Sequence, residues 1–236
     1  MLERIERLMV SARDTGNAIA HDLRTPLSRL RNKIEGALQT DKSDGPARET
    51  LEETIVEVDR VLTTFNSILR LSRLQAGEGG RMEILNVSDV AEQMAELYLP
   101  ACEEAGLSFE SKIDQNLHVL GDAGLIAQAL SNLLDNAVKY TPSGLIRLEV
   151  RNGRENDIVL SVIDSGPGIP EAARDKAKKR FARLDDARTL PGSGLGLALV
   201  EAAADVHNGM LILLDGDGPE ERPGLRAQLR IPRAKK

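Results

Sequence analysis

The stretch LSNLLDNAVKYTP, residues 130–142, decides the fold of the C-terminal part of this chain. It lies on a predicted helix from about Asp122 to Tyr140. Apolar residues recur along this helix at the spacing of one face, which predicts that the helix packs on a sheet. The residues of that face are Leu130, Leu133, Leu134, Ala137 and Val138.

A second face of the same helix is polar. Asn132, Asn136 and Lys139 follow one another at spacings of four and three residues, so their side chains share a direction. An amide oxygen can ligate a hard cation such as Mg²⁺, which takes its other ligands from water and substrate phosphates, and Lys139 can add positive charge there. The alternative is a solvated helix face with two ordinary asparagines.

Short strands and further helices surround this helix. Alternating runs predict strands at LIRLEVR (145–151) and DIVLSVID (157–164), and shorter strands at LSFES (107–111) and LHVL (117–120). Ser88 is expected to cap an earlier helix. A last helix is expected from about Gly194, before two more strand-like runs. Together these elements predict an α/β sandwich.

The motif DSGPGIP, residues 164–170, follows the strand that ends at Asp164. Gly166 and Gly168 let the backbone bend and approach a ligand, and the carboxylate can accept a hydrogen bond from an exocyclic amine. The alternative is a simple glycine–proline turn.

The motif GSGLGLALV, residues 192–200, places Gly192, Gly194 and Gly196 before an apolar helical run. Free N–H groups and the helix dipole favour anionic phosphate at such a position. The chain has no P-loop and no protein-kinase VAIK, HRD or DFG set, and these glycines follow the polar RLDDARTLP instead of a strand, which disfavours a Rossmann fingerprint.

The N-terminal part has a different pattern of apolar residues, which is helical throughout. Apolar residues recur every three or four positions from Leu2 to Leu38 and again from Leu51 to Leu71, with the polar break TDKSDGP between the two runs. This predicts an antiparallel helical hairpin. Pairing with a second copy would cover the remaining apolar surface in a four-helix bundle, so we expect a homodimer; packing of the hairpin on its own chain is the alternative.

GEGG at residues 77–80 breaks the helical period and predicts a linker. The expected organisation is α+β in two domains, with residues 1–76 as the helical domain and 81–236 as the sandwich.

Composition narrows the function classes. The 236 residues are 41% hydrophobic, enough for a globular core, and the net charge of -6 argues against a nucleic-acid binder. The single cysteine fits a reducing compartment, and no apolar run is long enough to span a membrane. We therefore expect a cytoplasmic location, and the helical period that begins at Leu2 with no cap ahead of it suggests a piece of a larger protein.

The helical domain carries the segment NAIAHDLRTPLSRLR, residues 17–31. Together with the three motifs of the sandwich, HDLRTP resembles the H box of the sensor histidine kinases of two-component signalling. LSNLLDNAVKY resembles their N box, DSGPGIP their first glycine box, and GSGLGLAL their second. The resemblance covers essentially the whole chain. It implies that the chain is the cytoplasmic portion of a membrane-bound sensor, with the membrane reached only through a sensor region absent from this chain. It implies a dimerisation and histidine-phosphotransfer domain, then an ATP-binding domain of the type shared with gyrase and a heat-shock chaperone.

The resemblance also implies roles in ATP binding. Asn136 would be the Mg²⁺ ligand, Asn132 and Lys139 would support the phosphates, Tyr140 would line the nucleotide pocket, and Asp164 would recognise adenine.

The expected reaction is phosphoryl transfer from ATP to His21. Its neutral imidazole would attack through Nε2, by family resemblance, while neighbouring Asp22 accepts the proton from the other nitrogen. Thr25, one helical turn further on, could position water for removing phosphate from a partner protein. His118 and His207 have no comparable setting and are expected to be structural.

The phosphoryl group would then pass to an aspartate of a response-regulator receiver domain. Exposed Arg24, Arg29 and Arg31 could steer that partner, or simply form the polar face of the helix. Two rival functions stay open: an ATP-responsive, catalytically silent dimeric scaffold, and a phosphatase-dominated switch.

By the same resemblance, Gly166 to Ser193 would be a mobile lid over ATP. The family usually places two phenylalanines in this stretch, whereas KAKKRFARLDD retains Phe181 but has Lys178 at the first position. The basic residues of this stretch could touch phosphate or keep a mobile helix solvated.

Overall fold

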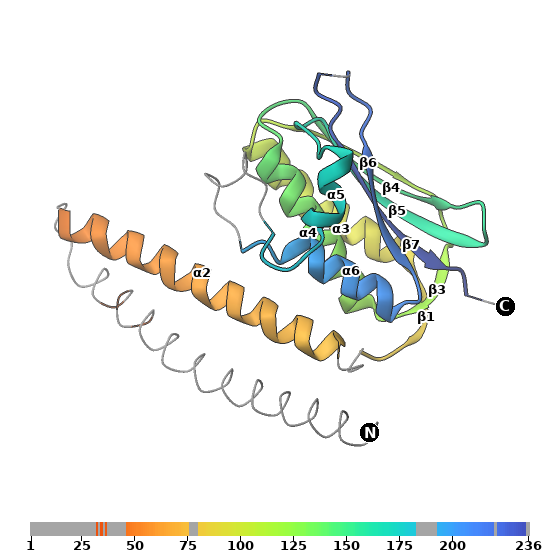
Figure 1. The fold of residues 1–236 in the computed structure, drawn as a ribbon, viewed down its shortest axis with the longest axis horizontal. Helices are drawn as coiled ribbons and strands as arrows, with labels where there is room; N and C mark the ends of the chain where they lie inside the picture. Colours follow the sequence, from red (N-terminus) through yellow and green to blue (C-terminus); the bar gives the residue numbers. More distant parts are fainter. Residues whose placement is uncertain are drawn as a thin grey trace. The chain divides into compact units, whose positions relative to one another are not determined.

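The computed structural model describes residues 32, 34, 36, 46–75, 80–182, 193–219 and 221–234. The chain divides into two compact units, Met1–Ala76 and Gly77–Lys236, whose elements are drawn in Figure 1.

The first unit contains the long helix α2, Pro46–Gln75. Proline suits the first turn of a helix because the N–H group it lacks would have no partner there. Arg48 and Glu52 form an ion pair one turn apart, with 3.0 Å between Nε and Oε1. The predicted second helix of the hairpin is therefore confirmed. Residues 32, 34 and 36 are also helical, and the rest of the predicted first helix lies outside the described residues.

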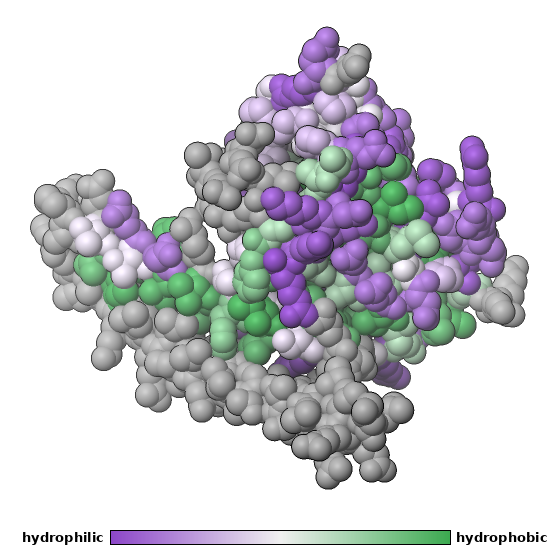
Figure 2. Space-filling view, in the orientation of Figure 1, coloured by the Kyte–Doolittle hydropathy of each residue, from purple (hydrophilic) through white to green (hydrophobic). Residues whose placement is uncertain are grey.

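Apolar side chains on α2 differ in exposure. Val58, Leu69 and Leu71 are buried, whereas Val56 is 62% exposed and Val61 43% exposed. Figure 2 shows hydrophobic residues along α2 on the visible face.

The second unit is built on a mixed five-stranded sheet, in the order β2-β4-β5-β7-β6. Strand β2 is parallel to β4, and the other neighbours are antiparallel. The strands are β2 (Ser108–Ile113), β4 (Leu145–Asn152), β5 (Asp157–Asp164), β6 (Met210–Asp215) and β7 (Leu225–Pro232).

Three helices cover one face of this sheet: α3 (Val87–Glu104), α4 (Ala123–Tyr140) and α6 (Gly196–Val206) (Figure 1). Alternate residues of the strands meet the apolar helix faces in one core. Ile146 and Leu160 of the sheet are fully buried, as are Leu130 and Leu134 of α4. Each such side chain contributes roughly 1.5–3 kcal/mol by leaving water. The predicted α/β sandwich is confirmed.

Some predicted boundaries were wrong. Asn86, not Ser88, caps α3, because the Asn86 carboxamide accepts from the Ser88 N–H group. Ser88 is buried, and its hydroxyl donates to Asp114 O over 2.7 Å. The last helix begins at Gly196, two residues after the predicted start.

Two short elements were not predicted. Strand β1, Glu83–Asn86, pairs antiparallel with β3, His118–Gly121. Its four residues are too few to show a period. Helix α5, Glu171–Ala177, lies inside the segment expected to be a lid, and its seven residues carry no apolar stripe.

None of the helices in the described ranges has the length and apolar character that crossing a membrane requires.

Candidate nucleotide-binding site

The polar face of α4 meets the first residue of α6. A β-carbon placed on Gly196 would lie 3.5 Å from Asn136 Nδ2 and 3.7 Å from Asn132 Oδ1. Gly196 of the motif GSGLGLALV thus lies directly against the two asparagines of LSNLLDNAVKYTP. These residues are 60 or more positions apart in the chain, and the packing of α6 on α4 brings them together.

The two asparagines differ in how far their amides are engaged. Asn132 Nδ2 donates to Gln128 O of its own helix over 3.0 Å, which leaves its oxygen facing Gly196. The side chain of Asn136 has no hydrogen-bond partner within the described part of the chain and is half-buried. Asn136 is therefore the amide most available to a ligand.

The N-terminus of α6 adds hydrogen-bond donors. Its N-cap, Leu195, has no side chain that could accept from the first-turn N–H groups, and the structure shows no side-chain cap there. An uncapped N-terminus carries the positive end of the helix dipole and unpaired N–H groups, which together favour an anion.

Lys139 is engaged with its neighbour. Its Nζ donates to Tyr140 OH over 2.7 Å and lies 4.4 Å from the centroid of that ring. Tyr140 thus holds the ammonium group at the end of α4. Within the described ranges, no hydrogen bond joins Lys139 to Asn132 or Asn136.

Asp164 ends β5 and is buried, with 8% of its surface exposed. Its Oδ1 accepts from Gly166 N–H over 2.8 Å and from Leu225 N–H over 3.3 Å. Burial raises the pKa of Asp164 above its ordinary value, although these two N–H groups and the charge of Arg222 act in the opposite direction. Oδ2 has no hydrogen-bond partner among the residues that the structure describes, so it can accept from a ligand.

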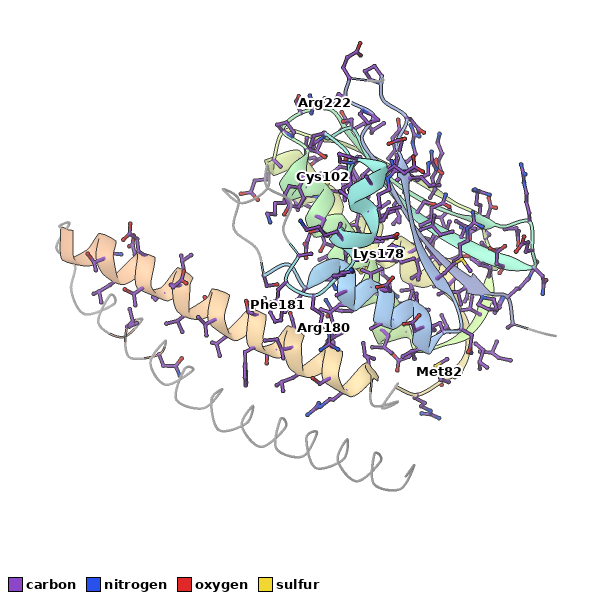
Figure 3. The ribbon with its side chains drawn as sticks, viewed as in Figure 1. Met82, Cys102, Lys178, Arg180, Phe181 and Arg222 are labelled. Carbon is purple, nitrogen blue, oxygen red and sulfur yellow. The ribbon has the colours of Figure 1, made fainter. Side chains whose placement is uncertain are left out.

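The environment of Asp164 includes residues that sequence motifs did not mark. Leu225 is the first residue of β7 and Arg222 lies just before that strand, where it donates to Ser143 O over 3.2 Å (Figure 3). The only signal in this segment was its glycine and proline content, which predicts a turn and no function.

The glycines of DSGPGIP are required by close packing. A β-carbon on Gly166 would lie 2.9 Å from Tyr140 O, so this residue brings the motif against the end of α4. Gly168 has φ +77°, and a β-carbon there would lie 2.5 Å from Gly224 O.

The segment after this motif is anchored to the sandwich. Arg174 of α5 donates from Nε to Ile169 O over 3.0 Å and pairs with Asp215 at the end of β6. Lys178 Nζ lies 3.8 Å from Glu201 Oε1 of α6 (Figure 3). Lys178, which stands where a phenylalanine was expected, therefore connects the C-terminal end of α5 to α6. Phe181 is 59% exposed.

Four predicted site residues, His21, Asp22, Thr25 and Gly192, lie outside the described residues. No group of three or more histidine, cysteine, aspartate or glutamate side chains in the described ranges could hold a metal ion. A cation at the asparagines would therefore need oxygen ligands from a bound phosphate and water, as Mg²⁺ commonly has.

Comparison with known families identifies both units. Residues 13–77 match the His Kinase A (phospho-acceptor) domain. Residues 121–235 match the histidine kinase-, DNA gyrase B- and HSP90-like ATPase.

Individual relatives agree with these matches. The sensor-like histidine kinase SenX3 of Mycolicibacterium smegmatis is 29% identical over 90% of this chain and 56% of its own length. The signal transduction histidine-protein kinase/phosphatase MprB of Mycobacterium sp. (strain KMS) is 33% identical over 90% of this chain and 42% of its own length. This chain thus spans about half the length of the curated relatives it matches.

A solved structure is also similar. The crystal structure of full-length ShkA in complex with AMPPNP matches with a TM-score of 0.78 and 26% identity, over 94% of this chain and 46% of that chain. Fold, motifs and relatives agree, and the chain belongs to the sensor histidine kinases of two-component signalling.

Proposed function

We propose that this chain is a kinase core that binds Mg-ATP between α4, α6 and the end of β5, transfers the γ-phosphoryl group to His21, and passes it to an aspartate of a response regulator. The observation that carries the proposal is the contact of Gly196, at the uncapped N-terminus of α6, with Asn132 and Asn136. Family membership and the AMPPNP bound to ShkA support ATP as the ligand.

The nucleotide would be held at two ends. Asp164 Oδ2 accepts from the exocyclic amine of adenine, Tyr140 lines the pocket, and Gly166 and Gly168 shape its wall. At the other end, Asn132, Lys139 and the backbone of Gly192, Gly194 and Gly196 hold the phosphates. The free Oδ2 of Asp164 and the free amide of Asn136 support this orientation.

Asn136 would supply the protein ligand of Mg²⁺. Its half-buried amide is a hard oxygen donor beside a positively polarised helix terminus, which fits a cation only when a phosphate is also present. The bound ion would neutralise part of the negative charge of the phosphates.

The transfer step needs one nucleophile and one base. Nε2 of His21 forms a bond to the γ-phosphorus as the bond from that phosphorus to the β,γ-bridging oxygen breaks, which leaves ADP. The proton on Nδ1 passes to the carboxylate of Asp22, so the imidazole becomes a neutral phosphohistidine. The ATP-binding residues contribute by aligning and desolvating the nucleotide.

This function assigns a role to each domain. Residues 1–76 would dimerise as a four-helix bundle and display His21. Residues 77–80 would connect this domain to residues 81–236, which would bind ATP. The division of the chain at Ala76 and the match of residues 13–77 support these boundaries. The receiver domain of a response regulator would dock near His21, and a sensor region outside this chain would attach the protein to the membrane from the cytoplasmic side.

A second activity, phosphatase action on the phosphorylated regulator, has one observation in its favour. The MprB relative is named a kinase/phosphatase, and in this chain Thr25 could position the attacking water. A catalytically silent scaffold that only responds to ATP is the remaining alternative.

Labelling of the purified chain with Mg-ATP carrying a radioactive γ-phosphate separates these functions. We expect acid-labile, base-stable label that is absent from His21→Ala. A protein that binds ATP without gaining label would be a scaffold. Rapid loss of label from an added phosphorylated receiver domain, dependent on Thr25, would indicate the phosphatase.

The metal role is tested separately. Asn136→Ala should weaken Mg-ATP binding in titration calorimetry by about tenfold, with a smaller loss when Mg²⁺ is omitted. Gln115→Ala, which removes an exposed amide of the same unit, is the control. Unchanged Mg-ATP affinity in Asn136→Ala would contradict the role.

A further inference from the structure

His207 is buried between the end of α6 and the beginning of α4. It is the C-cap of α6, and 2% of its surface is exposed. Its Nδ1 lies 2.6 Å from Ala203 O, and its Nε2 lies 3.0 Å from the backbone N of Asp122.

The two partners fix the protonation of the ring. A carbonyl oxygen only accepts hydrogen bonds, and a backbone N–H group only donates them. Nδ1 therefore carries the hydrogen and donates to Ala203, while Nε2 presents its lone pair to the Asp122 N–H group. His207 is a neutral imidazole in the Nδ1–H tautomer, and both of its ring nitrogens form hydrogen bonds.

One of these bonds connects the two helices of the candidate site. Ala203 belongs to α6 itself, so the first bond only orients the ring. Asp122 is the N-cap of α4, and its Oδ1 accepts from Leu125 N–H over 2.8 Å. The second bond therefore ties the C-cap residue of α6 to the N-cap residue of α4.

The neighbouring residue makes room for this arrangement. A β-carbon on Gly121 would lie 2.6 Å from Cδ2 of His207 and 2.8 Å from its Nε2. No side chain fits between Gly121 and the ring.

We infer that His207 is a positioning residue for phosphate binding, because its hydrogen bond to Asp122 fixes α6 along α4 and thereby holds Gly196 against Asn132 and Asn136. The inference rests on the proposed function of that site.

The composition of α6 explains why a directional bond is needed. Four of its six buried residues are alanines, Ala198, Ala202, Ala203 and Ala204, and the other two are Leu199 and Val200. Alanine side chains form only low ridges, so few interlocking contacts oppose sliding of α6 along its axis. A hydrogen bond at one end restricts translation along the helix axis, and a shift at His207 would move Gly196 at the other end.

Two substitutions separate the ring's bonds. The amide of Gln can place Oε1 where Nε2 of histidine lies, so His207→Gln keeps an acceptor for Asp122. The amide of Asn reaches only the position of Nδ1, so His207→Asn keeps the bond to Ala203 and loses the one to Asp122. His118→Asn, at an exposed histidine on β3, is the matched control.

The readout compares ligands with and without phosphates. We expect His207→Asn to bind Mg-AMPPNP about tenfold more weakly, the size of one lost buried hydrogen bond, and His207→Gln to lose much less. Adenosine, which would use the Asp164 end, should bind both variants as it binds the wild type. A merely structural residue would lower the melting temperature without changing the ratio of the two affinities.

Wild-type affinity for Mg-AMPPNP in His207→Asn, or an equal loss of adenosine and Mg-AMPPNP binding, would overturn the inference. Failure of the proposed function would look different, because the unsubstituted chain itself would then bind no Mg-AMPPNP.

A measurement on the unsubstituted chain decides the matter even if His207→Asn does not fold. Coupling is reciprocal, so a bond that favours phosphate binding must itself be strengthened by bound phosphates. Amide hydrogen exchange at Asp122 should slow more with saturating Mg-AMPPNP than with saturating adenosine. Equal exchange in the two complexes would overturn the inference.

Discussion

Two glycines of the motif at the start of α6 are required for different reasons. Gly194 has φ +69°, and a β-carbon there would lie 2.8 Å from Ala182 O. A β-carbon on Gly196 would make only ordinary contacts with Asn132 and Asn136. The fold therefore requires glycine at position 194, whereas only a bound ligand would require it at position 196.

Alanine at each position should separate the two reasons. Gly194→Ala should lower the free energy of unfolding by about 1–2 kcal/mol or more, through backbone strain and the clash with Ala182. Gly196→Ala should keep the stability of the wild type but bind Mg-ATP at least about tenfold more weakly, because its methyl group occupies space for phosphate. Urea unfolding and calorimetry measure the two effects; a destabilised Gly196→Ala with normal affinity would refute the distinction.

Asp164 should make nucleotide binding depend on pH. Its carboxylate is a stronger acceptor for the adenine amine when ionised, and burial raises its pKa. Affinity should therefore fall as the pH decreases through this raised pKa, at a higher pH than an exposed aspartate would give. Fluorescent-nucleotide titrations from neutral to acidic pH measure this dependence.

The variant Asp164→Asn supplies the control, because its amide does not titrate. Its affinity should be lower at neutral pH and flat across the range. Stability should depend on pH in the opposite direction, since the folded state holds the proton more tightly than the unfolded chain does. Ionised Asp164 costs stability, and this cost grows as the pH rises from the ordinary pKa to the raised one. An acid-independent affinity in the unsubstituted chain would contradict the role of Asp164.

At the scale of elements, α5 is too short to be stable alone and depends on its anchors. Arg174 makes two contacts, with Ile169 O and with Asp215, whereas Lys178 makes one longer ion pair with the partly exposed Glu201. Both ion pairs have a partly exposed carboxylate and such pairs are worth little, so the additional hydrogen bond to Ile169 O should make Arg174 the stronger anchor.

Arg174→Ala should therefore speed amide hydrogen exchange across residues 171–177 more than Lys178→Ala does. The melting temperature of the whole chain should change little in either variant, because the core lies elsewhere. Lys176→Ala, at an exposed position of the same helix, is the control. Equal exchange in all three variants would show that the described contacts do not hold α5.

At the scale of the whole molecule, the chain is expected to be a dimer through its helical unit. Val61 flanks the apolar stripe of α2, while Val56 lies on the opposite side, and both are exposed in one chain. Val61→Glu should shift the chain toward monomer in sedimentation, and Val56→Glu should not. Monomeric wild-type protein, or equal effects of both substitutions, would contradict the bundle.

Sequence patterns predicted much of this fold because the periodic apolar patterns extend over many residues and the four motifs follow one another in the order typical of the family. The 3.6-residue period marked α2 and α4, and alternation marked β4 and β5. The patterns could not predict β1, α5 or the true cap of α3, since these depend on tertiary contacts over a few residues.

The same limit applies to the site. Spacing placed Asn132 and Asn136 on one face, but only folding showed Gly196 against them. Lys139 was predicted by spacing alone, and its partner in the structure is Tyr140. The role of Leu225 comes from a backbone group, which no side-chain motif can reveal.

The central claim is that the ATP site of residues 81–236 phosphorylates one particular histidine. Peptide mass spectrometry after incubation with Mg-ATP, under conditions that spare phosphohistidine, tests it most directly. The account predicts one added phosphoryl group on the peptide that contains His21, and much less of it in Asn136→Ala at a Mg-ATP concentration that does not saturate this variant. Phosphate on a different residue, or full modification of His21 in Asn136→Ala, would contradict it.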